Sequence, residues 1–158
     1  MYKRQLENNL TVLFVEMVNK AGDCFSQTFT LSGPGKGNIS DQDEAGGLSG
    51  KLDFEKVKGL TPASINVEAI RKQYEEAKAM IPENYTFKSI GDYLIQETVP
   101  SGNEFLDRNK TFGEVKAEFS MNITENGKEI VESAGKKSVQ YYEVTFNVLP
   151  DGSVQMEE

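Results

Sequence analysis

Two acidic side chains stand where a calcium-binding loop would place ligands, and a third lies one residue past the last ligand position. In the segment DQDEAGG, Asp41 and Asp43 occupy the first and third positions of such a loop, and a glycine follows at the sixth. The fifth position is Ala45, which offers no side-chain oxygen, and Leu52 stands where the bidentate glutamate belongs, one residue before Asp53. The pattern therefore favours a solvated acidic loop, with Asp41, Asp43 and Asp53 as candidate ligands of an irregular cation site.

Two other segments carry incomplete ligand-binding patterns. The segment GPGKG at 33–37 is similar to phosphate-binding glycine loops, but it lacks the Lys-Ser/Thr ending and no helix pattern follows it. We interpret it as part of a glycine-rich linker or loop. The segment DRNKT at 107–111 offers oxygen atoms, but Phe112 occupies the position that needs glycine. We interpret it as an ordinary loop between strands.

The sequence also lacks the residues of the commonest catalytic sites. It contains no histidine, which removes the usual general base and the usual zinc ligand. Cys24 is the single cysteine, so an internal disulfide is impossible. We predict no catalytic residue and no cofactor. The enzyme alternative is a carboxylate-based hydrolase or carbohydrate-handling domain that uses tyrosines beside Asp or Glu, with the candidates Tyr85, Tyr93, Tyr141 and Tyr142.

Composition restricts the class of partner. The 158 residues carry 17 Lys and Arg against 25 Asp and Glu, a net charge of −8, which disfavours nucleic acid because phosphate binding needs clustered cations. No apolar run approaches the roughly 20 residues of a membrane-spanning helix. The opening MYKRQ resembles a translated sequencing-adapter string from a metagenomic fragment. If the string has that origin, any targeting segment lies upstream; the alternative is an ordinary N-terminus. The low cysteine content suits both the cytosol and the bacterial envelope, and of the compartments we favour the cell envelope or the exterior.

The elements that must position these side chains begin with a hairpin. Residues 11–19 and 24–31 are rich in β-branched and aromatic residues, and NKAGD between them has turn chemistry. Residues 6–32 are therefore predicted to be an N-terminal β-hairpin, either the tail of an upstream repeat or the edge of the main sheet. Residues 33–50 contain few large apolar residues and are predicted to be a linker or loop. Residues 51–158 are predicted to form a separate domain.

The next element is an amphipathic helix. Asn66 is a suitable N-cap, Glu68 lies in the first turn where a negative charge is favourable, and Pro82 ends the pattern. The apolar positions recur with alternating spacings of three and four residues, which predicts one face packed on a sheet. These positions are Val67, Ile70, Tyr74, Ala77 and Ile81.

Four strands are predicted after the helix, over residues 85–97, 112–124, 139–149 and 154–156, with a bulge at Gly91. Apolar and polar residues alternate along them, as in an antiparallel sheet with one buried and one solvated face. The predicted class is α+β, with one amphipathic helix packed on a four-stranded antiparallel sheet and a preceding β-hairpin. The predicted solvated face carries the candidate binding residues Lys116, Glu118, Ser120, Asn122, Gln140, Glu143 and Thr145.

The order of one helix and then four strands resembles small bacterial envelope modules of the PepSY and β-lactamase-inhibitor-protein-like type. The resemblance covers the last two thirds of the chain and implies an accessory part of an exported bacterial protein. We expect a non-catalytic binding module whose partner is a basic or neutral protein or peptide, bound at the solvated face or at an edge strand. A tandem repeat that serves only as a structural spacer is the other alternative to the enzyme.

Overall fold

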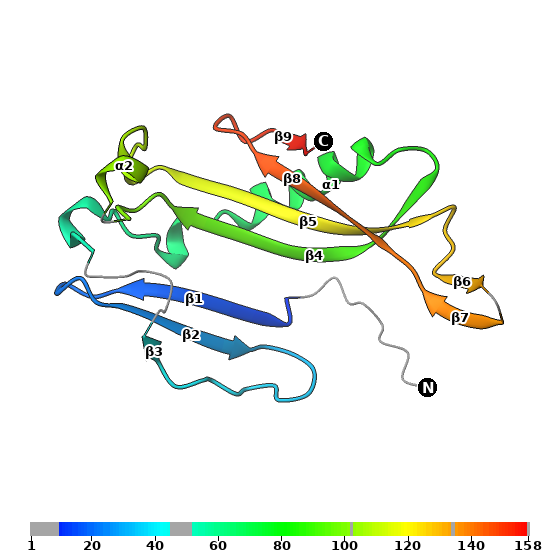
Figure 1. Cartoon of the computed structure of the whole chain (residues 1–158), viewed down its shortest axis with the longest axis horizontal. Helices are drawn as coiled ribbons and strands as arrows, with labels where there is room; N and C mark the ends of the chain where they lie inside the picture. Colours follow the sequence, from blue (N-terminus) through cyan, green and yellow to red (C-terminus); the bar gives the residue numbers. More distant parts are fainter. Residues whose placement is uncertain (1–9, 45–51, 102, 134, 158) are drawn as a thin grey trace. The chain divides into compact units, whose positions relative to one another are not determined.

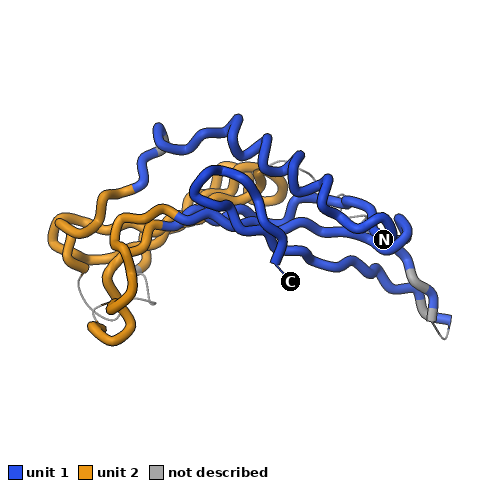
Figure 2. Tube along the Cα trace, turned by 90° about the horizontal axis from the view of Figure 1, so that it is seen from above, with its two compact units in different colours: residues 1–8, 60–96, 116–158 blue, residues 9–59, 97–115 orange. Residues whose placement is uncertain are grey.

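The computed structural model describes residues 10–44, 52–101, 103–133 and 135–157. The chain divides into two compact units (Figure 2). Unit 1 combines residues 1–8, 60–96 and 116–158, and unit 2 combines residues 9–59 and 97–115. Each unit therefore contains segments that are distant in sequence, and each is described separately below.

Unit 2 contains a three-stranded antiparallel sheet in the order β1-β2-β3 (Figure 1). Strand β1 (Val12–Val18) pairs along its length with β2 (Cys24–Thr30), which confirms the predicted hairpin. Gly22 closes the turn with φ 84°, and a Cβ atom there would lie 2.2 Å from the Leu52 carbonyl oxygen. Only glycine suits this position, because the turn needs a positive φ and the neighbouring backbone leaves no room for a side chain.

The glycine-rich segment after β2 turns back along that strand. The Thr30 amide bonds the Asn38 carbonyl oxygen at 2.9 Å, and the Gly37 amide bonds the Thr30 carbonyl oxygen at 2.8 Å. A short strand, β3 (Asp43–Glu44), then pairs with β2 and was not predicted. The described part of this segment is thus a hydrogen-bonded loop; residues 45–51 lie outside the described residues.

Unit 1 is built around a single long helix. Helix α1 (Val67–Met80) begins as predicted at Asn66, whose side-chain oxygen accepts a hydrogen bond from the Ala69 amide at 3.1 Å. Ala77 is fully buried in the core, with Tyr74 and Ile81 packed around it. Val67 is 62% exposed, so the prediction that it faces the sheet was wrong. It lies in the first turn, at the end of the helix remote from Ala77.

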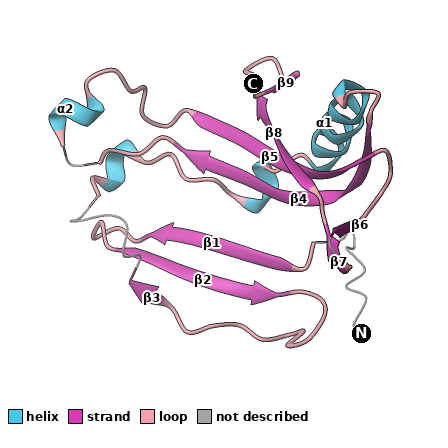
Figure 3. Ribbon diagram, turned by 45° about the vertical axis from the view of Figure 1, so that its right-hand side comes forward, coloured by secondary structure: helices cyan, strands magenta, loops and turns pink. Residues whose placement is uncertain are grey.

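The helix belongs to the same unit as a four-stranded antiparallel sheet in the order β4-β5-β8-β9 (Figure 3), which confirms the predicted α+β class. The strands are β4 (Tyr85–Glu97), β5 (Val115–Glu125), β8 (Tyr142–Val148) and β9 (Val154–Met156). Phe119 of β5 is paired with Phe146 of β8, and both rings are buried. With Ala77, Met121 and Val154 they form the core of this unit.

Several short elements were not predicted from the sequence. Strands β6 (Ile130–Ser133) and β7 (Lys136–Val139) form a small hairpin between β5 and β8, and its turn includes Gly135 at φ 74°. Two 3-10 turns, η1 (Phe54–Lys56) and η2 (Pro62–Ser64), precede α1. A single-turn helix, α2 (Glu104–Asp107), lies between β4 and β5. Among the described residues, no helix is long and apolar enough to cross a membrane.

Candidate functional site

The predicted solvated face is only partly open to solvent. The register pairs Ser120 with Thr145 and Asn122 with Glu143, so these residues do share one face of neighbouring strands. Ser120 is 4% exposed and Asn122 is 7% exposed, however, and the prediction that they are available to solvent was wrong. Their short side chains bond across to β4: Asn122 Nδ2 donates to Ser89 Oγ at 3.0 Å. Buried polar groups need such partners, so these two residues hold the strands together.

The rest of this face varies in exposure. Lys116, Glu143 and Gln140 are exposed, whereas Glu118 and Thr145 are half-buried. Gln140 lies between β7 and β8 and donates from Nε2 to the Tyr142 hydroxyl oxygen at 2.8 Å. Partner binding at this face stays a prediction.

The candidate cation ligands are found in separate local structures. Asp43 lies in β3 and Asp41 just before it, while Asp53 caps η1 by accepting a hydrogen bond from the Glu55 amide at 3.3 Å. Asp53 also forms an ion pair with Lys56 at 3.4 Å. In the part of the chain that the structure describes, no group of three or more Cys, Asp, Glu or His side chains is placed to hold a metal ion.

The tyrosines of the enzyme alternative fall into two environments. Tyr93 belongs to the core of unit 1, where its ring is stacked on Phe119 at 5.5 Å and its hydroxyl donates to Gln73 Oε1 at 2.7 Å. Burial raises the pKa of Tyr93, so it stays neutral at physiological pH. Tyr85 and Tyr142 make an edge-to-face pair at 5.6 Å, and Tyr141 is 52% exposed.

A hollow beside α1 has two carboxylate residues in its lining. It is lined by residues of the helix, among them Glu76, and of the β8–β9 turn, among them Asp151. Hydrogen bonds from the Ser153 side chain and backbone lower the pKa of Asp151. Glu76 Oε1 accepts a hydrogen bond from the Val154 amide at 3.4 Å. An aspartate with a lowered pKa is ionised at neutral pH and cannot serve as a general acid.

Cys24 has no feature of a reactive thiol. It is half-buried in β2, and burial, together with the nearby charges of Glu16 and Asp23, raises the pKa of its thiol. Because the thiolate is the nucleophile, a raised pKa makes the residue inert at neutral pH.

The most elaborate local structure in unit 2 is the segment between β4 and β5. We refer to residues 98–114 as the α2 loop. At its base the Thr98 amide bonds the Glu114 carbonyl oxygen at 2.7 Å, and the Gly113 amide bonds the Thr98 carbonyl oxygen at 2.9 Å. Just before it, the Glu97 carboxylate accepts hydrogen bonds from the Lys58 amide at 2.6 Å and the Gly59 amide at 2.7 Å. The ends of the loop are therefore close together and anchored, as in compact surface loops that often carry function.

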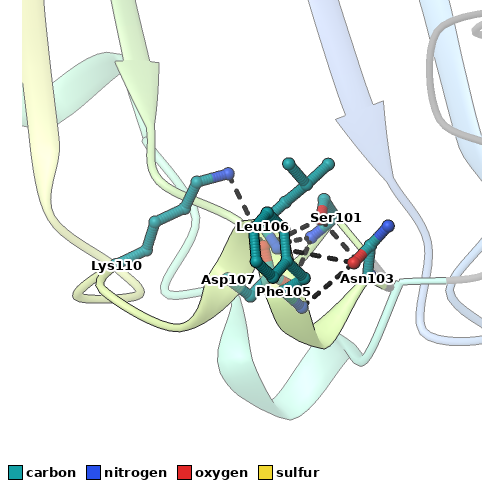
Figure 4. A network of polar contacts seen from close by, with 6 residues as sticks. All are labelled: Ser101, Asn103, Phe105, Leu106, Asp107 and Lys110. Atoms are coloured by element: carbon teal, nitrogen blue, oxygen red, sulfur yellow. Dashed lines mark hydrogen bonds and ion pairs between the residues drawn. The ribbon is translucent and has the colours of Figure 1, made fainter.

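Within the loop, Asp107 is the centre of a network of polar contacts (Figure 4). Its carboxylate accepts hydrogen bonds from the Ser101 hydroxyl at 2.8 Å and the Ser101 amide at 2.9 Å, and it pairs with Lys110 at 3.5 Å. Partial desolvation raises the pKa of Asp107, but the Ser101 hydrogen bonds and the Lys110 charge outweigh it, so the net pKa is lowered. The carboxylate stays ionised and serves as a fixed acceptor.

The side chain of Asn103 caps the start of α2. Asn103 Oδ1 accepts hydrogen bonds from the Phe105 amide at 3.0 Å and the Leu106 amide at 3.4 Å. These two bonds satisfy amides that a helix start otherwise leaves unpaired. The backbone that carries Phe105 and Leu106 is therefore held by Asn103 at one end of the turn and by Asp107 at the other.

The two apolar side chains of this turn are open to solvent. Phe105 is 74% exposed and Leu106 is 57% exposed. Arg108 lies over the Phe105 ring at 5.3 Å, the distance of a cation–π contact. Exposed single apolar residues are common. Phe105 and Leu106 differ in being adjacent to one another on a turn whose backbone is restrained by Asn103 and Asp107.

Sequence reasoning described this segment only as a loop. The signals that could have indicated α2 are Asn103 as N-cap and Glu104 in the first turn, followed by two apolar residues. The turn is too short to show a helical period, so the spacing of its apolar residues does not indicate a helix. The clamp between Ser101 and Asp107 depends on loop closure, which is not visible in the sequence.

Comparison with protein-family models, with curated proteins and with solved structures finds no match to this chain.

Proposed function

We propose that this chain is a non-catalytic binding module that contacts a protein partner through the α2 loop. The observation that carries the proposal is the 74% exposure of Phe105 on a backbone restrained at both ends of its turn. An aromatic anchor in an interface fills a dry pocket on the partner. Its truncation therefore commonly costs about 2 kcal/mol or more of binding free energy. A restrained loop also loses little conformational entropy on binding.

The charges around Phe105 favour an apolar pocket on the partner. Glu104 and Asp107 are balanced by Arg108 and Lys110, so the tip of the loop carries no net charge in a chain of net charge −8. Contact at the tip is therefore governed by apolar burial and shape. The negative charge of the remaining surface would attract a basic partner over longer distances, and this steering weakens as salt rises; a neutral partner would be neither attracted nor repelled.

The alternatives receive less support from the described residues. A carboxylate-based hydrolase needs one carboxyl group that stays protonated near neutral pH, and Asp107 and Asp151 both have lowered pKa values. A structural spacer does not require an exposed aromatic residue such as Phe105 on a restrained turn. The likeness in element order to bacterial envelope modules supports an accessory role in an exported protein, and that role is part of the proposal.

The test is an affinity capture with matched variants, using extract from the source cells. The bait is the full chain, compared with a double variant carrying Phe105→Ala and Leu106→Ala. The control is Leu10→Ala, because Leu10 is 63% exposed in the same unit but lies outside the loop. We expect a partner that binds the wild type and the control and that binds the double variant at least about tenfold more weakly, a change of roughly 1.4 kcal/mol.

Three results would count against the proposal. A partner that binds the double variant as tightly as the wild type removes the α2 loop from the interface. Equal loss with Leu10→Ala shows that the effect is not specific to the loop. Failure to capture any partner with the wild-type chain favours the structural spacer. Melting temperatures of all three proteins verify that the variants remain folded.

A further inference from the structure

A shallow hollow lies in unit 1 where β5 ends and β8 begins. It has a volume of about 140 Å³ and is lined by Glu125, Asn126, Lys128, Gln140 and Tyr142. Pockets that enclose a drug-sized ligand have volumes of roughly 300–1,000 Å³. A ligand of this hollow would therefore lie on the surface, with one of its units seated and the rest extending past it.

One wall of the hollow is an aromatic ring in a fixed orientation. Tyr142 is 37% exposed, and its ring meets Tyr85 edge to face at 5.6 Å with an interplanar angle of 83°. Its hydroxyl oxygen accepts a hydrogen bond from Gln140 Nε2 at 2.8 Å. The Tyr142 side chain is thus held by the Tyr85 ring and, at its hydroxyl, by Gln140. A pyranose ring has one face rich in C–H groups, which can pack on such a ring because the aromatic face is apolar and electron-rich.

The remaining lining offers neutral hydrogen-bonding groups. The side-chain amides of Asn126 and Gln140 supply both donors and acceptors, which is what the hydroxyl groups of a sugar require. Glu125 and Lys128 carry opposite charges, so the lining has no net charge. A neutral ligand fits this balance better than an ionic one, and the net charge of −8 on the chain repels polyanions.

The polar side of the hollow is also held in place by its backbone. Asn126 has φ 49° and is followed by Gly127 at φ 69°, a turn that the Lys128 amide closes by bonding the Glu125 carbonyl oxygen at 2.9 Å. The Asn126 amide bonds the Asn84 carbonyl oxygen at 2.8 Å. A weak carbohydrate contact depends on such restraint, because the protein groups of the hollow then lose little conformational entropy on binding.

We propose that this hollow is a subsite for a neutral oligosaccharide, with Tyr142 as the stacking platform and Asn126 and Gln140 as the hydrogen-bonding groups. The inference is independent of the α2 loop, since every residue that it uses belongs to unit 1. Either proposal can therefore fail without the other.

The test is a titration of the full chain with three neutral probes, cellohexaose, mannohexaose and laminarihexaose. Binding is measured by calorimetry and by the NMR shifts of the Asn126 and Gln140 side-chain amides. We expect at least one probe to give saturable shifts of these amides. Tyr142→Ala should weaken its binding at least about tenfold, a change of roughly 1.4 kcal/mol, whereas Tyr142→Phe keeps the ring and should retain most of the affinity.

The matched control is Tyr141→Ala, because Tyr141 is the adjacent tyrosine, is 52% exposed and does not line the hollow. It should bind the probe as the wild type does. The proposal is overturned if none of the three probes shifts the two amides, or if Tyr141→Ala loses binding while Tyr142→Ala retains it. It is also overturned if hexaglycine shifts the same amides and the sugars do not, since the hollow would then bind peptide.

Discussion

A Cβ atom placed on Gly91 of β4 would lie 2.2 Å from the Ser120 hydroxyl oxygen on β5. That hydroxyl accepts a hydrogen bond from the Asp92 amide at 3.2 Å and donates one to the Asp92 carboxylate. Ser120 therefore lies over the bare backbone of Gly91 and bonds the next residue along the strand. The glycine is needed here for close approach of the two strands. The bulge predicted at Gly91 stays a prediction.

Gly91→Ala should destabilise unit 1. The new methyl group would overlap the Ser120 hydroxyl, and relief requires either displacement of that side chain or a shift of the strand. Overpacking of this kind typically costs about 1–3 kcal/mol in free energy of unfolding. The measurement is urea denaturation followed by circular dichroism.

The control for this prediction is Ser120→Ala and the double variant with Gly91→Ala. Ser120→Ala removes the hydroxyl oxygen and the two hydrogen bonds to Asp92, so by itself it should cost about 1 kcal/mol. In its presence Gly91→Ala should cost less than in the wild type, because the nearest atom is gone. Strictly additive costs would show that the hydroxyl is not what excludes a side chain at position 91.

Two positions on one face of β5 should differ sharply in their tolerance of truncation. Met121 and Val115 both belong to the odd positions of β5, but Met121 is 0% exposed and Val115 is 51% exposed. Met121→Ala should cost about 2–5 kcal/mol, because it removes core contacts and leaves a cavity. Val115→Ala should remain within about 0.5 kcal/mol of the wild type. Similar melting temperatures for the two variants would contradict the placement of the core.

Tyr74 should make the free energy of unfolding depend on pH in the alkaline range. Burial, and then the proximity of Tyr93 and Asp92, raises the pKa of Tyr74 well above its ordinary value in the folded state. In the unfolded chain the hydroxyl ionises near about pH 10. The unfolded state therefore binds fewer protons above that pH, and stability is lost as the pH rises further.

The measurement for this prediction compares the wild type with Tyr74→Phe by urea denaturation from about pH 8 to about pH 11. The wild type should lose more stability over this range than the variant does, since phenylalanine has no hydroxyl to ionise. Comparison with the variant removes the contribution of the lysines, which titrate in the same range. Parallel curves for the two proteins would show that Tyr74 is solvated.

Asp107 should titrate below the ordinary pH range of an aspartate. Its pKa is lowered by the hydrogen bonds from Ser101 and by the Lys110 charge, which together outweigh partial desolvation. The stabilising contribution is therefore present above the pKa of the unfolded chain and is lost as the pH falls through the folded value. The Ser101 amide proton reports this directly, because it donates to the carboxylate. Its NMR shift should have a midpoint below the ordinary aspartate pKa of about 3.9.

Two variants distinguish the contributions to this low pKa. Ser101→Ala removes the side-chain hydrogen bond at 2.8 Å and should raise the midpoint. Lys110→Ala removes a partly exposed charge at 3.5 Å and should raise it less, because solvent screens that pair. A larger effect from Lys110→Ala would mean that charge, and not the Ser101 clamp, holds the carboxylate.

Local sequence patterns were sufficient for the elements that have a regular period. The helix over 67–80 follows from the capping asparagine and the apolar spacing, and the strands over 85–97 and 154–156 were predicted with the observed bounds. Such elements are readable because one face is buried along most of their length, so each residue type reports its environment. Alternation in β5 likewise placed Phe119 and Met121 in the core correctly.

Alternation did not reveal that the second face of β5 is buried at Ser120 and Asn122. Ser120 and Asn122 are polar and were expected in solvent, but each has a hydrogen-bond partner on β4 and is buried. The sequence shows that a side chain is polar. The register between strands decides whether that side chain bonds to water or to a neighbouring strand.

The sequence by itself determined the class of fold and the acidic charge. It also excluded any chemistry that uses histidine, because the chain contains none. The tertiary structure alone decided the sites on which both proposals rest. The clamp on Asp107 forms because the α2 loop closes at its base, and the hollow at Tyr142 forms because the end of β5 lies beside the start of β8. Both arrangements join residues that have no common period and no local motif. Both depend on loop closure and strand pairing, which are properties of the folded chain.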